Sequence, residues 1–155
     1  MTTRLSALNE LNALDKTDLA AANDKLVRVT ITATGGSGGA TAGTISVQVS
    51  DLQGNAITRA VNLQLDSSLT QFAGPLAATG TAFFGAASTG TLVLGSGALT
   101  ALVTTDATGL YEGALSDAAD ETAYFSATTA PGGAASNAAG CVVAECVPDS
   151  ATWSA

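Results

Sequence analysis

Four carboxylates around one predicted turn are the side chains of this sequence best suited to chemistry: Glu112, Asp117, Asp120 and Glu121. Pairs of carboxylates hydrolyse glycosides, and carboxylate oxygens clustered on a turn can bind Ca²⁺. Their spacing matches no EF-hand loop, and no sugar-stacking aromatic cluster accompanies them, because Trp153 is the only tryptophan. We interpret the group as a solvated turn, with weak Ca²⁺ binding by Asp117, Asp120 and Glu121 as the alternative.

Other constellations of catalytic residues are missing from the sequence. Histidine is absent, which removes the commonest general base, the usual catalytic triads and most metal sites. The glycine-rich segment 34–40 lacks the Gly-Lys-Ser/Thr of a phosphate-binding loop, so we interpret it as a flexible loop. The sequence therefore predicts a protein that is not an enzyme and has no cofactor and no metal site.

Two cysteines, Cys141 and Cys146, lie in the apolar run 140–147. If that run is one strand, they point to opposite faces with Cα atoms roughly 16 Å apart. A disulfide needs less than about 7 Å, so we predict free, buried thiols, with a bridge between subunits as the alternative. Two cysteines without histidine cannot complete a zinc site.

Charge divides the chain into a neutral leader and an acidic body. Residues 1–28 hold four bases and four acids, whereas the remainder sets the single base Arg59 against nine of the chain's 13 acids, for a net charge of −8 overall. Such a body repels phosphate groups and anionic lipids, which argues against nucleic-acid and membrane-surface binding. Solubility alone is the simpler explanation of the charge.

Targeting and membrane segments are not predicted. The first residues contain no continuous apolar stretch of the kind that a signal peptide needs. No run reaches the roughly 18 apolar residues of a membrane helix. We therefore expect synthesis in a cytosol without export by the usual route.

The first 26 residues are predicted to form an arm, and residues 27–155 a single β domain. Leucines recur every three residues from Leu5 to Leu14. Part of this spacing fits a short helix, and all of it fits an extended arm laid in a groove, so both conformations stay open. We predict that leucines of the arm bind a partner: Leu5, Leu8, Leu11, Leu14 and Leu19.

Alternating apolar and polar residues after Val27 predict β-strands. The runs Val27–Ala33, Ile45–Ser50 and Val61–Leu65 alternate cleanly, as half-buried strands do. The segment Asp51–Ala56 has turn residues, so we predict that the last two runs form an antiparallel hairpin. Its buried face would comprise Ile45, Val47, Val49, Val61, Leu63 and Leu65.

Shorter strands are predicted in the rest of the chain, at 81–84, 91–94, 98–105, 110–115, 123–127, 140–147 and 151–154. About eight to ten short strands with a turn every 8–12 residues indicate an all-β antiparallel sandwich or barrel. Helix would be confined to the N-terminal arm.

Trp153 and the pair Phe83–Phe84 each allow two interpretations. Trp153 either fills the core and fixes the C-terminus or binds a partner, since tryptophan is enriched at interface hot spots. Neighbours on a strand face opposite sides, so one phenylalanine could point inward and the other toward a partner.

Three segments resemble structural proteins of tailed-phage virions. Residues 5–29 are similar to N-terminal segments of fibre and head-decoration proteins, in which a leucine-spaced arm leads into the first strand. Here the pair Asn23–Asp24 precedes that strand. The segment 103–127 resembles the end of the immunoglobulin-like domains of phage structural proteins, and 51–56 resembles a turn of the same domains. Together they cover about 60 of the 155 residues, and the region 83–97 fits no version of the pattern.

The resemblance implies a capsid decoration (cement) protein with an immunoglobulin-like domain. Such a protein would form a homotrimer on the capsid, bind the major capsid protein, and be made in the host cytoplasm. The arm would clamp neighbouring subunits, and the acidic body would face solvent. The alternatives are another virion part, such as a head fibre, tail or neck protein, and an immunoglobulin-like adhesion or carbohydrate-binding module.

Overall fold

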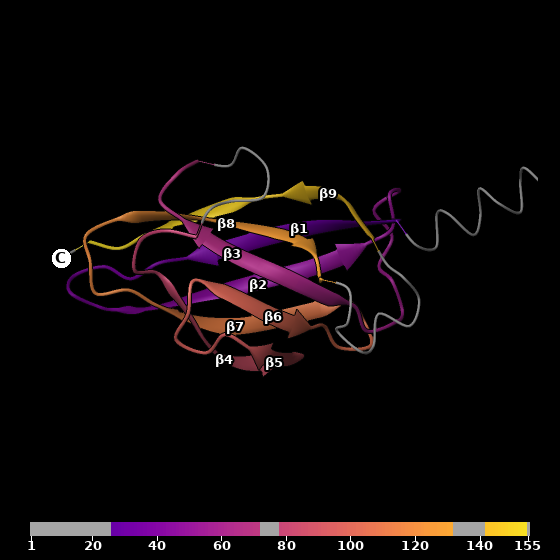
Figure 1. The fold of residues 1–155 in the computed structure, drawn as a ribbon, viewed down its shortest axis with the longest axis horizontal. Coiled ribbons are helices and arrows are strands. Elements are labelled where there is room, and N and C mark those ends of the chain that lie inside the picture. The colour runs from indigo at the N-terminus through magenta and orange to yellow at the C-terminus, as the bar shows by residue number, and fades with distance from the viewer. Residues whose placement is uncertain (1–25, 72–77, 132–141, 155) are drawn as a thin grey trace, which may run out of the picture.

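The fold is a β-sandwich of two five-stranded sheets (Figure 1). A computed structural model describes residues 26–71, 78–131 and 142–154, so the arm and its leucines lie outside the described residues. The first sheet has the order β4 (Phe83–Thr89), β7 (Leu110–Ser116), β2 (Ala42–Ser50), β1 (Leu26–Thr34), β9 (Val142–Val147). The second has the order β10 (Asp149–Thr152), β8 (Thr122–Thr129), β3 (Asn62–Ser68), β6 (Thr100–Thr104), β5 (Thr91–Leu94).

Ten strands confirm the predicted all-β class, and the strands follow the predicted runs closely. The strand β5 occupies the predicted residues 91–94, whereas β4 shares only residues 83–84 with the run predicted at 81–84 and continues to Thr89. The described strand pairs are antiparallel except β1 with β9, which is parallel. In the described part of the chain, no helix has the length and apolar character needed to cross a membrane.

The core lies between the two sheets and consists of the inward side chains of the alternating strands. All six residues predicted for the buried face are at most 1% exposed. The first sheet also contributes Phe84 of β4, and the second contributes Phe125 of β8, whose ring meets that of Phe84 edge to face at a centroid distance of 5.9 Å. Period-two alternation thus identified the residues that hold the sheets together.

The predicted hairpin between 45–50 and 61–65 is wrong. The strand β2 pairs with β1 and β7, whereas β3 belongs to the other sheet and pairs with β6 and β8. The turn residues are as predicted, since the Asp51 amide donates to the Asn55 carbonyl at 2.9 Å, but the turn leads the chain across to the second sheet. Two strands that face each other across a core bury the same residues as two strands side by side, so alternation alone cannot distinguish these arrangements.

The turn 105–109 between β6 and β7 is organised by one carboxylate. The Asp106 Oδ1 atom accepts hydrogen bonds from the Thr108 amide at 2.8 Å, the Thr108 hydroxyl at 2.7 Å and the Leu110 amide at 3.0 Å. Gly109 has a φ of +77°, a conformation that suits glycine. These donors, the Leu110 amide foremost, lower the pKa of Asp106 from its ordinary value of 3.8.

Asp106→Asn is expected to lower the unfolding temperature near pH 7, with a difference from wild type that shrinks in acid. The folded-state pKa of Asp106 lies below its unfolded value, so the ionised group stabilises the fold fully above the unfolded pKa. That stabilisation is lost as the pH falls through the folded-state pKa. Thermal unfolding measured from about pH 7 to about pH 2 checks this, and a difference that is constant over this range would contradict it.

Candidate functional site

Trp153 is the one predicted partner-binding residue that the described structure contains, and it lies in the core. Its side chain is 2% exposed, and its indole Nε1 donates to the Thr41 carbonyl at 3.2 Å. Its backbone amide donates to the Glu121 carbonyl at 2.9 Å. A Cβ atom on Gly43 would lie 2.8 Å from Cζ2 of the indole, so the ring packs directly on the backbone of β2. This placement matches the core interpretation of Trp153, in which it fixes the C-terminus.

The pair Phe83–Phe84 divides between two environments. Phe84 is 1% exposed and belongs to the core, whereas Phe83 is half-buried on the opposite side of β4. Neighbouring residues on a strand point in opposite directions, as the sequence predicted.

The predicted carboxylate group is not a single cluster. Glu112 lies within β7 and accepts a hydrogen bond from the Thr89 hydroxyl at 2.9 Å. Asp117 is 3% exposed and accepts from the Thr81 hydroxyl at 2.6 Å, and Glu121 accepts from the Thr81 amide at 2.7 Å. Among the described residues, no group of three or more His, Cys, Asp or Glu side chains is arranged to hold a metal ion. The geometry gives Asp117 and Glu121 the role of holding the chain ahead of β4.

Asp117→Ala is expected to lower the free energy of unfolding by about 1–3 kcal/mol. The substitution removes a buried carboxylate and the acceptor of two partly buried hydrogen bonds, from the Thr81 hydroxyl and from the Ala119 amide at 2.9 Å, and leaves the Thr81 hydroxyl only its longer bond to Glu121 at 3.2 Å. Urea unfolding checks this, with Asp117→Asn as the matched control because its amide oxygen can still accept both bonds. Equal losses in the two variants would contradict this role.

Cys146 is half-buried and is not part of a disulfide. Burial raises the pKa of its thiol, and the Ala127 amide, which donates to Sγ at 3.3 Å, partly offsets this. Cys141 lies outside the described residues, so the predicted separation of the two cysteines remains a prediction.

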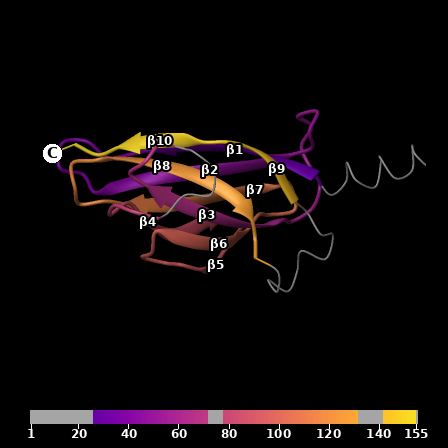
Figure 2. The ribbon, with the colours of Figure 1, turned by 45° about the horizontal axis from the view of Figure 1, so that its top comes forward.

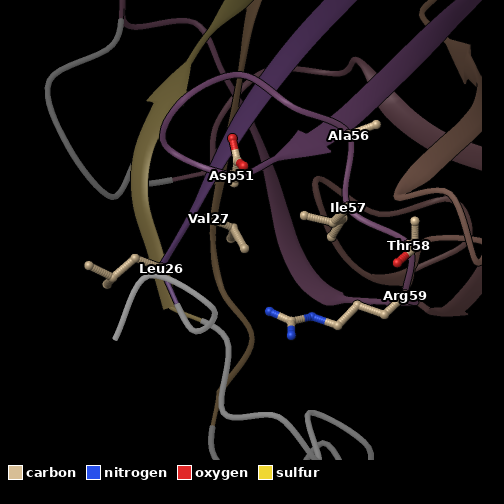
Figure 3. A pocket seen from close by; sticks show the side chains of 7 residues that line it. All are labelled: Leu26, Val27, Asp51, Ala56, Ile57, Thr58 and Arg59. Carbon is tan, nitrogen blue, oxygen red and sulfur yellow. The ribbon is translucent and has the colours of Figure 1, made fainter. Parts of the chain in front are cut away.

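A cleft of about 220 Å³ opens beside the start of β1 (Figure 3). Arg59 reaches along one side of it, and Ile57 points in from the loop between β2 and β3. A second hollow of about 310 Å³ lies near Tyr124 and Asp149. Typical small-molecule sites are enclosed and measure roughly 300–1,000 Å³. Both hollows are open, so the geometry favours contacts along the surface over an enclosed ligand site.

The edge strands of the two sheets lie in pairs at opposite sides of the sandwich, with β9 and β10 at one side and β4 and β5 at the other (Figure 2). The two sides differ in the residues that they expose. On the first side, Glu145 of β9 forms an ion pair with Arg28 at 3.7 Å. Asp149 of β10 accepts a hydrogen bond from the Ala33 amide at 2.9 Å, and Pro148 joins the two strands. Charged residues and proline are the usual protection of a sheet edge against further strands.

The other side, which we call the β4–β5 edge, comprises Phe83–Leu94 and contains neither a charged residue nor a proline. Its strands are irregular instead, with register shifts in both β4 and β5. Two side chains of β5 are the most exposed large apolar residues of the described structure, Val93 at 54% and Leu94 at 64%. The sequence contains no charged residue between Asp66 and Asp106. The sequence pattern predicts residues 91–94 as a strand but does not show that their side chains are exposed. The long uncharged stretch in an acidic chain was the signal that could have found this surface.

Comparisons with known proteins give no relative for this chain. No protein-family model matches it, no curated protein matches it, and no solved structure matches it.

Proposed function

We propose that the chain is a non-enzymatic virion structural protein of the capsid decoration (cement) type, which binds and stabilises the outer capsid surface. The observation that carries this proposal is the uncharged β4–β5 edge, with Val93 and Leu94 exposed, on a body of otherwise acidic character. An exposed apolar surface on a charged protein is typical of a site that binds another protein. Its partners would be further copies of the chain, as a homotrimer, and the major capsid protein.

The arm supplies the second contact of this proposal. Leu5, Leu8, Leu11, Leu14 and Leu19 would be buried in a groove between capsid subunits, at a gross gain on the order of 1.5–3 kcal/mol each. Ordering the arm would offset much of that gain. The acidic body repels nucleic acid and anionic membranes. On the outer surface of a capsid it would face solvent, away from the packaged nucleic acid.

The described side chains support binding of protein more than binding of carbohydrate. Four of the aromatic side chains lie in the core, each at most 2% exposed: Phe84, Tyr111, Phe125 and Trp153. Phe83 and Tyr124 are partly exposed, on different sheets. The alternative of a carbohydrate-binding or adhesion module would rest on Tyr124, which lines the open hollow of about 310 Å³.

The test is the composition of purified virus particles from the genome that encodes this chain. We expect quantitative mass spectrometry to find the chain in a copy number comparable with that of the major capsid protein. A few copies per particle would indicate a fibre, tail or neck protein instead. Absence from particles, together with failure to sediment with capsids that lack decoration, would overturn the proposal.

A further inference from the structure

We infer that a small hollow between residues 39–41 and 117–120 binds Ca²⁺ through the carboxylates of Asp117 and Asp120. This site lies outside the proposed function and does not depend on it. Of the three carboxylates for which the sequence left Ca²⁺ binding open, these two line the hollow, whereas Glu121 accepts hydrogen bonds from Thr81 instead.

The hollow has a volume of about 100 Å³, and hydrogen bonds hold its walls in place. Its lining comes from three segments, 39–41, 117–120 and 153–154. The Thr41 carbonyl accepts from the Asp117 amide at 2.9 Å and from the Trp153 indole at 3.2 Å, and the Gly39 amide donates to the Ser154 carbonyl at 3.3 Å. The volume is below that of sites for drug-sized molecules. It has room for an ion with a few waters, each of which takes up about 30 Å³ in the liquid.

A buried oxygen of Asp117 is the observation that points to a ligand. The residue is 3% exposed, and its Oδ1 accepts from the Thr81 hydroxyl at 2.6 Å and from the Ala119 amide at 2.9 Å. Its Oδ2 is covered and has no hydrogen-bond partner among the described residues. Leaving a buried charged oxygen without a partner is costly, and a bound water or ion is a common reason for such an atom. Because Oδ1 is engaged, Oδ2 is the oxygen that remains for a ligand in the hollow that Asp117 lines.

The distribution of charge selects a cation as this ligand. The carboxylates of Asp117 and Asp120 both belong to the lining. The two bases among the described residues, Arg28 and Arg59, lie beside the start of β1, at the opposite end of the sandwich from the C-terminus (Figure 1). Solvent and salt screen charges at such separations, so neither base can serve as the counter-ion, and a dissolved cation can.

The available donor atoms favour Ca²⁺ over a transition metal. Carboxylates and backbone carbonyls are hard oxygen ligands, of which Ca²⁺ takes roughly six to eight, with waters filling the remaining positions. Histidine, a typical ligand of transition metals, is absent from the chain. Two carboxylates make a weak site, in keeping with the lack of any metal-holding group of three such side chains among the described residues. We therefore expect a dissociation constant on the order of 10⁻⁴–10⁻³ M.

Trp153 makes this site directly observable. It is the only tryptophan of the chain, and it lines the hollow. The ion Tb³⁺ binds where Ca²⁺ binds, and it emits light when a nearby excited indole transfers energy to it. The measurement is a titration of the full-length protein with Tb³⁺ under excitation of tryptophan, followed by displacement with Ca²⁺. We expect an emission that saturates and that excess Ca²⁺ removes.

Three variants locate the bound ion. Asp117→Asn keeps an oxygen for the bonds from Thr81 and Ala119 and removes the charge, and Asp120→Asn removes a charge at an exposed residue, so the second variant decides if the first does not fold. Each should raise the Tb³⁺ concentration at half-saturation at least about tenfold, because even the loss of a group that supports a metal ligand costs about 10–100-fold in affinity. Glu112→Gln, the matched control, removes the same charge from β7 and should bind as the wild type does.

Several outcomes would overturn the inference. One is an emission that does not saturate or that Ca²⁺ does not displace, and another is an emission that persists in Trp153→Phe, since the ion would then lie elsewhere. Equal weakening in Glu112→Gln would show that net charge alone attracts the ion. Particle composition is unaffected by any of these results, so the inference and the proposed function can fail separately.

Discussion

Trp153→Ala is expected to lower the free energy of unfolding by about 3–5 kcal/mol, the usual cost of removing a buried aromatic ring. The indole is 2% exposed, packs on the backbone at Gly43 and donates to the Thr41 carbonyl. Its removal would leave a cavity between β2 and the C-terminal strand and would leave the Thr41 carbonyl with the hydrogen bond from the Asp117 amide at 2.9 Å alone. For a chain of this size, the loss corresponds to a fall in unfolding temperature on the order of 10 °C.

Two further variants separate packing from hydrogen bonding and from surface effects. Trp153→Phe retains much of the ring but loses the hydrogen bond from Nε1. Its free energy of unfolding should therefore lie about 1 kcal/mol below that of the wild type. Leu52→Ala removes a side chain that is 36% exposed, and a change within about 0.5 kcal/mol is expected. Unchanged stability in Trp153→Ala, with weaker association, would instead restore the interpretation of Trp153 as a partner-binding anchor.

The sequence predicted the strands and the core well because both depend on local alternation. The residues of β2 and β3 that it assigned to the buried face are buried, and the bounds of β5 agree residue for residue. Strand partners depend on contacts between distant segments, which a period of two residues does not encode. The prediction therefore failed at the hairpin, where correct turn residues at Asp51–Asn55 lead the chain into the other sheet.

The candidate surface was harder to predict than the fold for a related reason. The exposure of Val93 and Leu94 depends on β5 lying last in its sheet, and nothing within the run 91–94 indicates that position. The apolar residues of an edge strand look like core residues until the sheet order is known. Trp153 is the opposite case, because tryptophan is a typical interface residue and yet its side chain lies in the core. There its indole donates to the Thr41 carbonyl and packs on the backbone of Gly43.

Phe84→Ala and Phe125→Ala are each expected to lower the free energy of unfolding by about 3–5 kcal/mol. The two rings come from different sheets, are at most 1% exposed, and meet at a centroid distance of 5.9 Å with an interplanar angle of 69°. An edge-to-face pair of this kind contributes about 0.5–1.5 kcal/mol beyond the burial of its area. The double variant should therefore lose less than the sum of the single losses by about that amount, as measured by urea unfolding.

The same variants test how β4 is held in place beside the proposed contact. Phe84 anchors β4 to the core, so Phe84→Ala should weaken self-association together with stability, whereas Val93→Asp should weaken self-association and leave stability nearly unchanged. Phe125 lies on β8, which is separated from β5 by β3 and β6. Phe125→Ala should therefore lower stability about as much as Phe84→Ala does, but should weaken self-association less. Losses that are additive within about 0.3–0.5 kcal/mol would show that the rings are not coupled, and β4 would then need another anchor.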